Sequence, residues 1–303
     1  MDINSLIGIL NSEGATLRLY FTRKRGIKYI SYSPQINDFL QKKMKKLIVN
    51  YINQFSNIEQ VNFSPVGYKE ETIEKCNTSY INSYEDVLSS FKEENVIREP
   101  IDDDTVNKLN FYCLIISYDN KEVYFFRRVT KFKKLSSSGI FGRIKGNKFD
   151  EIDATLLGID GNIDIVVNGN EVLILNHIAL ERIFSLSEQY QEKAKVAIGL
   201  IKNTNRINNF EQFEEDCLKD GRITRTLTKM LTEGDKLEKC FEKFSNVINV
   251  IDLFELDIDI DNSGEIDKIE YCDKEQLMDI IRLVRDSYYM SIINELPGID
   301  DTI

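Results

Sequence analysis

Residues 111–129 read FYCLIISYDNKEVYFFRRV and indicate the fold class of the chain. Two apolar runs rich in β-branched and aromatic residues flank the polar turn DNKE, and this pattern is typical of a β-hairpin. A second hairpin is predicted at 161–176, where Asn168-Gly169 supplies the positive φ that a tight turn requires. We therefore expect antiparallel hairpins at the centre of the fold.

Helices are predicted around these hairpins, where an apolar residue recurs every three or four positions. They span residues 35–54, 84–94, 178–202, 209–219, 222–232, 235–247 and 273–294. Further strands are predicted at 16–21, at 27–32, near Val61 and at 254–261, with TRKRG at 22–26 as a turn and DDD at 102–104 in a loop. The sequence thus predicts an α+β protein, with antiparallel β-hairpins packed with several helices over 111–303 and a smaller N-terminal α/β subdomain at 1–110.

The charge of the chain is unevenly distributed. The net charge is −11, yet residues 1–150 hold 23 Lys/Arg and 18 Asp/Glu, whereas residues 151–303 hold 16 and 32. Such an asymmetry suggests a localised polyanion-binding surface, or two surfaces that attract each other in an assembly.

Composition also excludes several classes of protein. The first 21 residues lack the basic segment and cleavage pattern of a signal peptide, and no apolar run approaches the roughly 20 residues that span a bilayer. Five cysteines without a C-x-x-C pair indicate reduced, buried thiols in a cytosolic protein. His177 is the only histidine, so two-histidine zinc sites are excluded. We expect a soluble intracellular protein that needs no metal or cofactor.

The strongest candidate site is a basic run between Glu122 and Asp150 that contains no acidic residue. Its cations are Arg127, Arg128, Lys131, Lys133, Lys134, Arg143, Lys145 and Lys148. Cations on a Ser/Gly-rich segment suit contacts with DNA phosphates, and Phe125, Phe126, Phe132 and Phe141 could stack on bases, although phenylalanines in a hairpin are more often core. The alternative is a solvated loop, because runs of like charge are often only that.

Two smaller basic clusters could extend this surface if they are neighbours in the fold. One comprises Arg23, Lys24, Arg25 and Lys28, and the other comprises Lys42, Lys43, Lys45 and Lys46 on the helix predicted at 35–54. Taken alone, the helix lysines fit a solvent-facing stripe better than a binding site.

Two acidic patterns invite metal chemistry. Residues 259–270, DIDNSGEIDKIE, fit the twelve-residue loop of an EF-hand, but the alternation upstream predicts a strand where an EF-hand needs a helix, so a hairpin turn is the better interpretation. Asp160, Asp164 and Glu171 resemble a nuclease pattern, yet Leu173 stands where the activating lysine should be. His177, which begins a predicted helix, is expected to be a packed or capping residue.

From residue 111 onward the order of motifs resembles the KwaB family of the Kiwa antiphage system. The similarity is carried by FYCLIISY and EVYFFRRV, then by F-D-x-I-D, then by GNIDIVVNGNEVLILNHIALERIFSLSEQY, and finally by LVRDSYYMSII. It extends over about residues 111–295 and contains no catalytic fingerprint.

The resemblance implies a cytosolic DNA-binding protein of antiviral defence. Such a protein would self-associate as a homodimer or higher homo-oligomer, dock on the inner face of the membrane protein KwaA, and suppress phage DNA replication and transcription without an enzymatic step. The family transfers no DNA-contacting residues position by position, so Arg127, Arg128 and the other cations are predicted from charge alone. The alternatives are a scaffold that assembles by charge pairing without nucleic acid, and a metal-dependent nuclease.

Overall fold

The computed structural model describes residues 1–67, 70–131, 142–145, 147–151, 157–293 and 295–300. The chain forms two compact units: unit 1 is Met1–Phe63 with Tyr68–Leu186, and unit 2 is Ser64–Gly67 with Ser187–Ile303. Unit 1 carries 24 Lys/Arg and 24 Asp/Glu, and unit 2 carries 15 and 26. The whole net charge of −11 therefore belongs to unit 2, and any basic surface on unit 1 must be local. These units do not coincide with the predicted segments 1–110 and 111–303.

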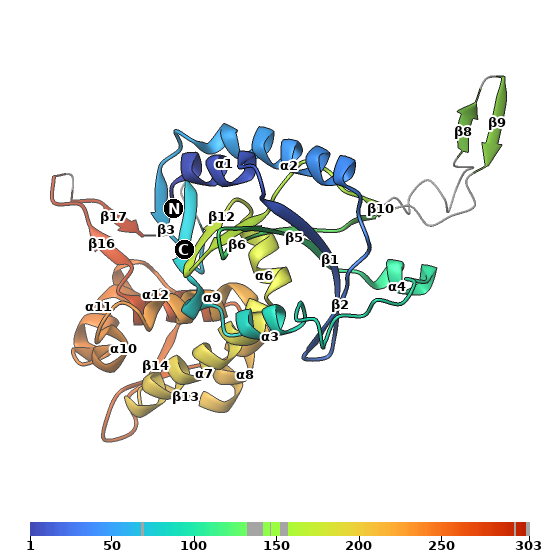
Figure 1. Ribbon diagram of the computed structural model, residues 1–303. Helices are drawn as coiled ribbons and strands as arrows, with labels where there is room; N and C mark the ends of the chain where they lie inside the picture. Colours follow the sequence, from blue (N-terminus) through green and yellow to red (C-terminus); the bar gives the residue numbers. More distant parts are fainter. Residues whose placement is uncertain (68–69, 132–141, 146, 152–156, 294, 301–303) are drawn as a thin grey trace. The chain divides into compact units, whose positions relative to one another are not determined.

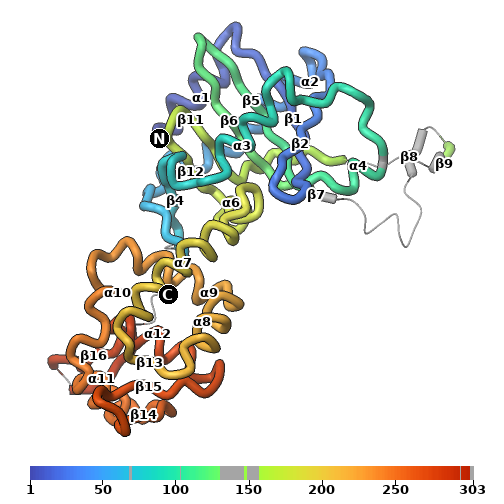
Figure 2. The backbone as a smooth tube through the Cα atoms, turned by 90° about the horizontal axis from the view of Figure 1, so that it is seen from below, coloured from blue at the N-terminus to red at the C-terminus, as the bar shows by residue number. Residues whose placement is uncertain are grey.

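An eight-stranded sheet forms the centre of unit 1 (Figure 1). In spatial order its strands are β2 (Lys28–Tyr32), β1 (Thr16–Arg25), β5 (Phe111–Tyr118), β6 (Lys121–Arg128), β11 (Ile165–Asn168), β12 (Glu171–Ile174), β4 (Ile73–Asn77) and β3 (Gln60–Asn62). All pairs are antiparallel except β3 and β4. Figure 2 shows β5 and β6 running between β1 and β11. β1, from before residue 110, thus pairs directly with β5, from after it.

Both predicted hairpins are confirmed, with shifted turns. β5 and β6 are joined by Asp119 and Asn120 alone, whose φ angles of 49° and 58° suit a two-residue hairpin turn. β11 and β12 are joined by Gly169-Asn170, one residue later than predicted. The predicted TRKRG turn was wrong, because Thr22–Arg25 continue β1 and pair with β2 down to Arg25 opposite Lys28.

Helices cover both faces of the sheet (Figure 1). On one face lie α1 (Ile3–Asn11) and α2 (Asp38–Ile52), whose buried residues include Leu6 and Ile48 and pack on inward-facing residues of β1, β5 and β6. On the other face lie α3 (Tyr84–Ser89) and α6 (His177–Ile183), where Phe126 contacts the ring of Phe184. The predicted 35–54 helix is therefore confirmed as α2, trimmed at both ends.

Smaller elements complete unit 1. Two 3₁₀ turns are η1 (Asn53–Phe55) and η2 (Thr78–Tyr80), and short strand pairs are β7 (Thr130–Lys131) with β10 (Leu157–Gly158) and β8 (Gly142–Lys145) with β9 (Lys148–Glu151). The predicted loop at 102–104 was wrong, because Asp102 accepts a hydrogen bond from the Thr105 amide (2.7 Å) and caps α4 (Asp103–Lys108). Aspartate is a preferred N-cap residue, so a run of aspartates can begin a helix.

Unit 2 is mainly helical. Its elements are α7 (Leu186–Asn203), α8 (Phe210–Lys219), α9 (Gly221–Met230), α10 (Lys236–Lys239), α11 (Phe244–Leu253), α12 (Leu277–Arg285), the strands β13 (Ile207–Asn208), β14 (Asp259–Asp261) and β15 (Lys268–Glu270), and the hairpin of β16 (Tyr288–Met290) and β17 (Pro297–Ile299). Their apolar faces enclose one core that includes Phe213, Leu227 and Ile280. With the sheet of unit 1, this arrangement confirms the predicted α+β class.

Four predicted elements near or in unit 2 are wrong in extent. The 178–202 helix is broken at Phe184 and Ser185, because Ser185 takes a left-handed φ of 53°. The 235–247 helix is split into α10 and α11, and only β14 remains of the 254–261 strand. The final helix ends at Arg285, where Asp286 turns left-handed (φ 60°), and the hairpin follows.

Candidate anion-binding site at the end of the sheet

Arg127, near the end of β6, is held by two aspartates. Its Nη1 donates to Asp164 Oδ1 at 2.7 Å, and its Nη2 and Nε donate to Asp160 at 2.7 and 3.1 Å. Tyr112 of β5 donates to the same Asp160 carboxylate at 3.3 Å. The Arg127 side chain is 17% exposed and that of Asp164 only 1%. A bidentate pair of this kind is among the strongest side-chain contacts.

This pairing decides what Arg127 can do. Burial opposes its charged form, but the hydrogen bonds and charges of Asp160 and Asp164 outweigh burial and raise the pKa of the guanidinium. Asp164 also accepts the Arg128 amide at 2.8 Å, so the cluster ties the end of β6 to the segment before β11. Because its nitrogens are engaged by these carboxylates, Arg127 acts as a structural cation rather than as a free phosphate ligand.

The predicted nuclease residues do not come together. Asp160 and Asp164 contact Arg127, whereas Glu171 lies at the far end of the β11–β12 hairpin, where it pairs with the amino terminus of Met1 at 3.4 Å. Glu171 pairs with Asn168, which lies four residues along the chain from Asp164. A strand rises about 3.3 Å per residue, so about 13 Å separates the two positions and one metal ion could not bind both. Within the described residues, no three His, Cys, Asp or Glu side chains are grouped so as to hold a metal.

Arg128, the next residue, faces the opposite side of the sheet because side chains alternate along a strand. It lines a cavity of about 440 Å³, together with Leu109, Asn110, Arg127, Val129, Arg182 and Ile183. The Nε of Arg128 is buried, and none of the residues that the structure describes places an acceptor against it. Among the described residues, neither Arg128 nor Arg182 has a carboxylate partner. A buried, unpartnered guanidinium donor is costly, and an incoming anion would satisfy it.

The Arg23–Lys28 cluster lies beside this cavity, so two of the predicted basic regions are neighbours. The Lys24 amide donates to Asn110 Oδ1 at 2.8 Å, and Asn110 lines the cavity. Lys24 Nζ donates to Ser185 Oγ at 2.6 Å, just after α6. β1 and β6 both pair with β5, so Lys24 and Arg128 come to the same end of the sheet. Arg23 places its guanidinium over the Tyr32 ring, 5.7 Å from the centroid.

The α2 lysines are elsewhere. Lys42, Lys43 and Lys46 are exposed, and Lys45 donates to the carbonyl of Ala15, just before β1. Lys45 therefore lies near the start of β1, whereas Lys24, beside the cavity, lies nine residues beyond Ala15. At the usual rise of a strand this is a distance of about 30 Å. These lysines form a solvent-facing stripe that does not share the cavity.

The remaining predicted cations are only partly described. Lys148 is exposed in β9. Lys131 lies in β7, and Arg143 and Lys145 lie in β8, for which the structure describes the backbone alone. Lys133 and Lys134 lie outside the described residues, as do Phe132 and Phe141. Phe125 and Phe126 are buried core residues, so they cannot stack on bases.

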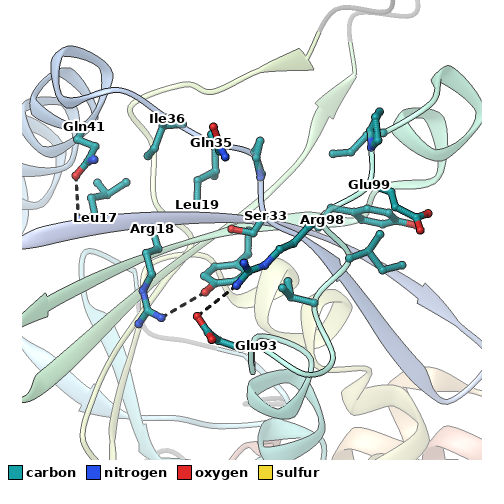
Figure 3. A pocket seen from close by; sticks show the side chains of 17 residues that line it. Leu17, Arg18, Leu19, Ser33, Gln35, Ile36, Gln41, Glu93, Arg98 and Glu99 are labelled. Carbon is teal, nitrogen blue, oxygen red and sulfur yellow. Dashed lines mark hydrogen bonds and ion pairs between the residues drawn. The ribbon is translucent and has the colours of Figure 1, made fainter.

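A second cavity, of about 560 Å³, opens beside the first half of β1 (Figure 3). β2 ends before Ser33-Pro34, so the edge of β1 at Leu17 and Leu19 has no partner strand, and Gln41 of α2 accepts the Leu17 amide at 3.2 Å. The cations of this groove have partners, because Arg98 pairs with Glu93 at 3.3 Å and Arg18 pairs with Glu122. The groove is therefore a weaker anion site than the Arg128 cavity.

His177 is packed at the start of α6, as predicted. Its Nδ1 lies 2.7 Å from Glu74 Oε2 and its Nε2 lies 3.6 Å from Glu181 Oε1, while its ring stacks on Phe63. Burial disfavours the imidazolium, but the two carboxylates outweigh burial and raise the pKa of His177 to about 9. The residue is a charged structural link between β4 and α6.

The EF-hand-like segment forms a hairpin, as the alternation predicted. β14 and β15 pair with Asp259 opposite Glu270, and the chain enters the loop from a strand. The side chain of Asn208 donates to both Asp261 and Glu270, at 2.9 and 2.8 Å. The carboxylates of Asp261 and Glu270 thus share one amide donor.

The five cysteines are unpaired, and three of them, Cys113, Cys217 and Cys240, are buried as predicted. Cys76 is half-buried and Cys272 is exposed, so the expectation of buried thiols was wrong for Cys272. None of the helices in the described part of the chain combines the length and apolar character needed to cross a bilayer.

Arg182 and Asn110 were not among the predicted site residues. Arg182 stands on a helix within an acidic stretch and Asn110 precedes the first hairpin, so neither belongs to a run of like charge. The cavity forms because the end of α6 meets the ends of β5 and β6, and this proximity carries no sequence signal.

Comparison with known protein families supports the resemblance seen in the motifs. Residues 106–294 match the family described as KwaB, Kiwa protein KwaB-like. No curated protein and no solved structure shows significant similarity to the chain. The family match covers well over half of the 303 residues and includes the strand that carries Arg127 and Arg128. The chain therefore belongs to the KwaB-like family and is a protein of the Kiwa defence system.

Proposed function

We propose that this Kiwa protein binds DNA without sequence preference, through phosphate contacts at the end of the sheet where Arg128, Arg182 and Lys24 gather. The observation that carries the proposal is the side chain of Arg128, which lines a cavity and whose buried Nε has no acceptor among the described residues. Guanidinium groups bind phosphate oxygens through two parallel hydrogen bonds, and contacts with phosphates carry no sequence information. The exposed side chains of Arg25, Lys28 and Lys148 add local positive charge to unit 1.

We further propose that the protein acts without an enzymatic step, at the inner face of the cell membrane and together with KwaA. Family membership suggests a partner from the same Kiwa system, and KwaA is that partner. Suppression of phage DNA replication and transcription would then follow from occupancy of the DNA. The ion pairs of Arg127 with Asp160 and Asp164 favour a non-enzymatic role, because they occupy the carboxylates that a nuclease would need for metal ions.

The Arg128→Gln, Arg182→Gln double variant tests the site. We expect about a tenfold or larger loss of affinity for duplex DNA at moderate salt, because each charge-assisted hydrogen bond contributes about 1.5–3 kcal/mol. The slope of log affinity against log salt should fall by about two, one for each phosphate that the variant no longer neutralises. Fluorescence anisotropy with a labelled duplex across a salt series measures both quantities.

The matched control is the Arg98→Gln, Arg222→Gln variant, which removes the same charge from exposed positions outside the cavity. It should bind as the unmodified protein does. Equal affinity of the unmodified protein and the cavity variant would remove this cavity from the DNA site. Supercoiled plasmid incubated with Mg²⁺ or Mn²⁺ should stay intact, and its cleavage would refute the non-enzymatic proposal.

A further inference from the structure

The hairpin of β16 and β17 exposes large apolar side chains at its tip. Ile292 is 97% exposed, Ile293 90% and Leu296 61%, and Tyr289 and Met290 on β16 are 54% and 44% exposed. Single exposed apolar residues are ordinary on protein surfaces. Five within eight residues concentrate exposed apolar side chains on this one hairpin, and such a concentration is typical of a surface that another molecule covers.

The hairpin is a built structure that holds this patch in place. The Ser291 amide donates to the Leu296 carbonyl at 2.9 Å and closes the loop, and the Asp300 amide donates to the Ser287 carbonyl at 2.8 Å at the base. The Tyr289 ring lies across Gly298, where a Cβ would come within 2.6 Å of the ring. Cross-strand packing of an aromatic ring over glycine is a device that stabilises strand pairs.

One side of β16 anchors the hairpin in unit 2. Tyr288 is buried, donates to Asp279 at 2.9 Å and packs its ring on Phe254. Side chains alternate along a strand, so Tyr289 points away from that anchor. Figure 1 shows β16 and β17 extending away from α11 and α12 of the same unit. The hairpin is thus preformed and anchored through Tyr288, which lowers the entropy cost of binding.

The charges around the hairpin define the partner. The sequence contains no lysine or arginine after Arg285, and Arg285 itself faces Asp300, with Nη2 and Oδ2 3.8 Å apart. Asp286 and Asp300 stand at the base of the hairpin and Glu295 stands in its loop, so the hairpin is acidic, on a unit that carries the whole net charge of the chain. Acidic flanks repel an anionic bilayer and a second acidic unit alike.

We infer that the hairpin tip is a docking element for a protein with an apolar recess bordered by lysine or arginine. Short cytoplasmic loops of membrane proteins carry such an excess of basic residues. The inference rests on the proposed function in one respect: within that proposal, KwaA is the partner that offers this chemistry. Ile292 and Ile293 insert into the recess, and the acidic side chains of the hairpin meet its basic border.

The test uses the Ile292→Ser, Ile293→Ser variant of the full-length protein and tagged KwaA in detergent. We expect KwaA to retain the unmodified protein and to retain the variant at least about tenfold less, because buried central residues dominate interface energies. The control is the Val196→Ser, Leu253→Ser variant, which removes two exposed apolar side chains elsewhere in unit 2. Thermal melting of both variants should match that of the unmodified protein, since all four side chains are largely exposed.

Each other outcome overturns a specific statement. Equal retention of the hairpin variant and the unmodified protein refutes the docking role alone. Failure of KwaA to retain the unmodified protein refutes the proposed partnership as well, while DNA affinity, measured separately, should be the same for the hairpin variant in every case. If the variant instead changes the mass in light scattering, a second copy covers the tip. If it no longer binds zwitterionic vesicles that the unmodified protein binds, lipid covers the tip.

Discussion

Replacement of Arg127 by alanine should lower the free energy of unfolding by about 3–5 kcal/mol, the usual cost of removing one partner from a buried ion pair. The physical reason is the Asp164 carboxylate, which is 1% exposed and would be left buried without its partner. Asp160, bonded to two nitrogens of the same guanidinium, would also be deprived of its partner. Chemical denaturation followed by circular dichroism measures the change.

Variants of Asp164 show whether the loss of stability comes from the buried carboxylate that Arg127→Ala leaves without a partner. Asp164→Asn alone should be less costly than Arg127→Ala, because the amide is neutral and can still accept the Arg128 amide. Adding Asp164→Asn to Arg127→Ala should restore part of the stability, since the buried charge of Asp164 is then gone. Strictly additive effects would show that Arg127 and Asp164 do not interact energetically.

The contrast between Arg127 and Arg128 shows how far sequence reasoning could reach. From charge alone, both residues belonged to one basic run and both were predicted to contact DNA phosphates. Their position in a strand was also predicted, and alternation along a strand already requires that neighbours face opposite sides. Which of the two meets aspartates, and which lines the cavity beside Arg182 without them, depends on Asp160, Asp164 and Arg182, all more than 30 residues away in the chain. Only the folded sheet supplies that information.

The fold was predicted best where the pattern is local. The two hairpins and the helix at α2 were recovered because alternation and helical periodicity are short-range signals. The errors lie where a tertiary contact outweighs the local pattern. Thr22–Arg25 read as a polar turn, yet pairing with β2 and β5 extends β1 through them. The helix break at Ser185 depends on a left-handed φ, which the presence of a serine does not predict.

The distribution of charge is different when it is counted over the two compact units rather than over two halves of the sequence. A cut at residue 150 gave a basic half and an acidic half, whereas the compact units give a neutral unit 1 and a unit 2 that carries the full −11. A neutral unit cannot attract DNA by its total charge. The proposed DNA binding would therefore depend on a local arrangement: within the described residues, Arg128 and Arg182 lack carboxylate partners, while Arg18, Arg98 and Arg127 have them. Under this proposal, a few contacts rather than the net charge would set the salt dependence of binding.

The His177 cluster makes the stability of the protein depend on pH in a defined direction. The pKa of His177 in the folded protein is raised from 6.5 to about 9, so its stabilising contribution is complete below pH 6.5 and is lost as the pH rises through about 9. One pKa unit corresponds to about 1.4 kcal/mol, and the side chains of His177, Glu74 and Glu181 are all less than 15% exposed. We therefore expect the free energy of unfolding to fall by about 2–3 kcal/mol across this range.

The His177→Gln variant separates this effect from other titrating groups. Glutamine keeps a hydrogen-bond donor for Glu74 but carries no charge, so the variant should be less stable than the unmodified protein at about pH 6 and nearly equal to it at about pH 9. Buried thiols such as Cys240, whose pKa burial raises to about 12, destabilise both proteins equally at high pH. The quantity to follow is thus the difference between the two denaturation curves at each pH. A difference that stays constant from about pH 6 to pH 9 would mean that the imidazole is not charged between its two carboxylates.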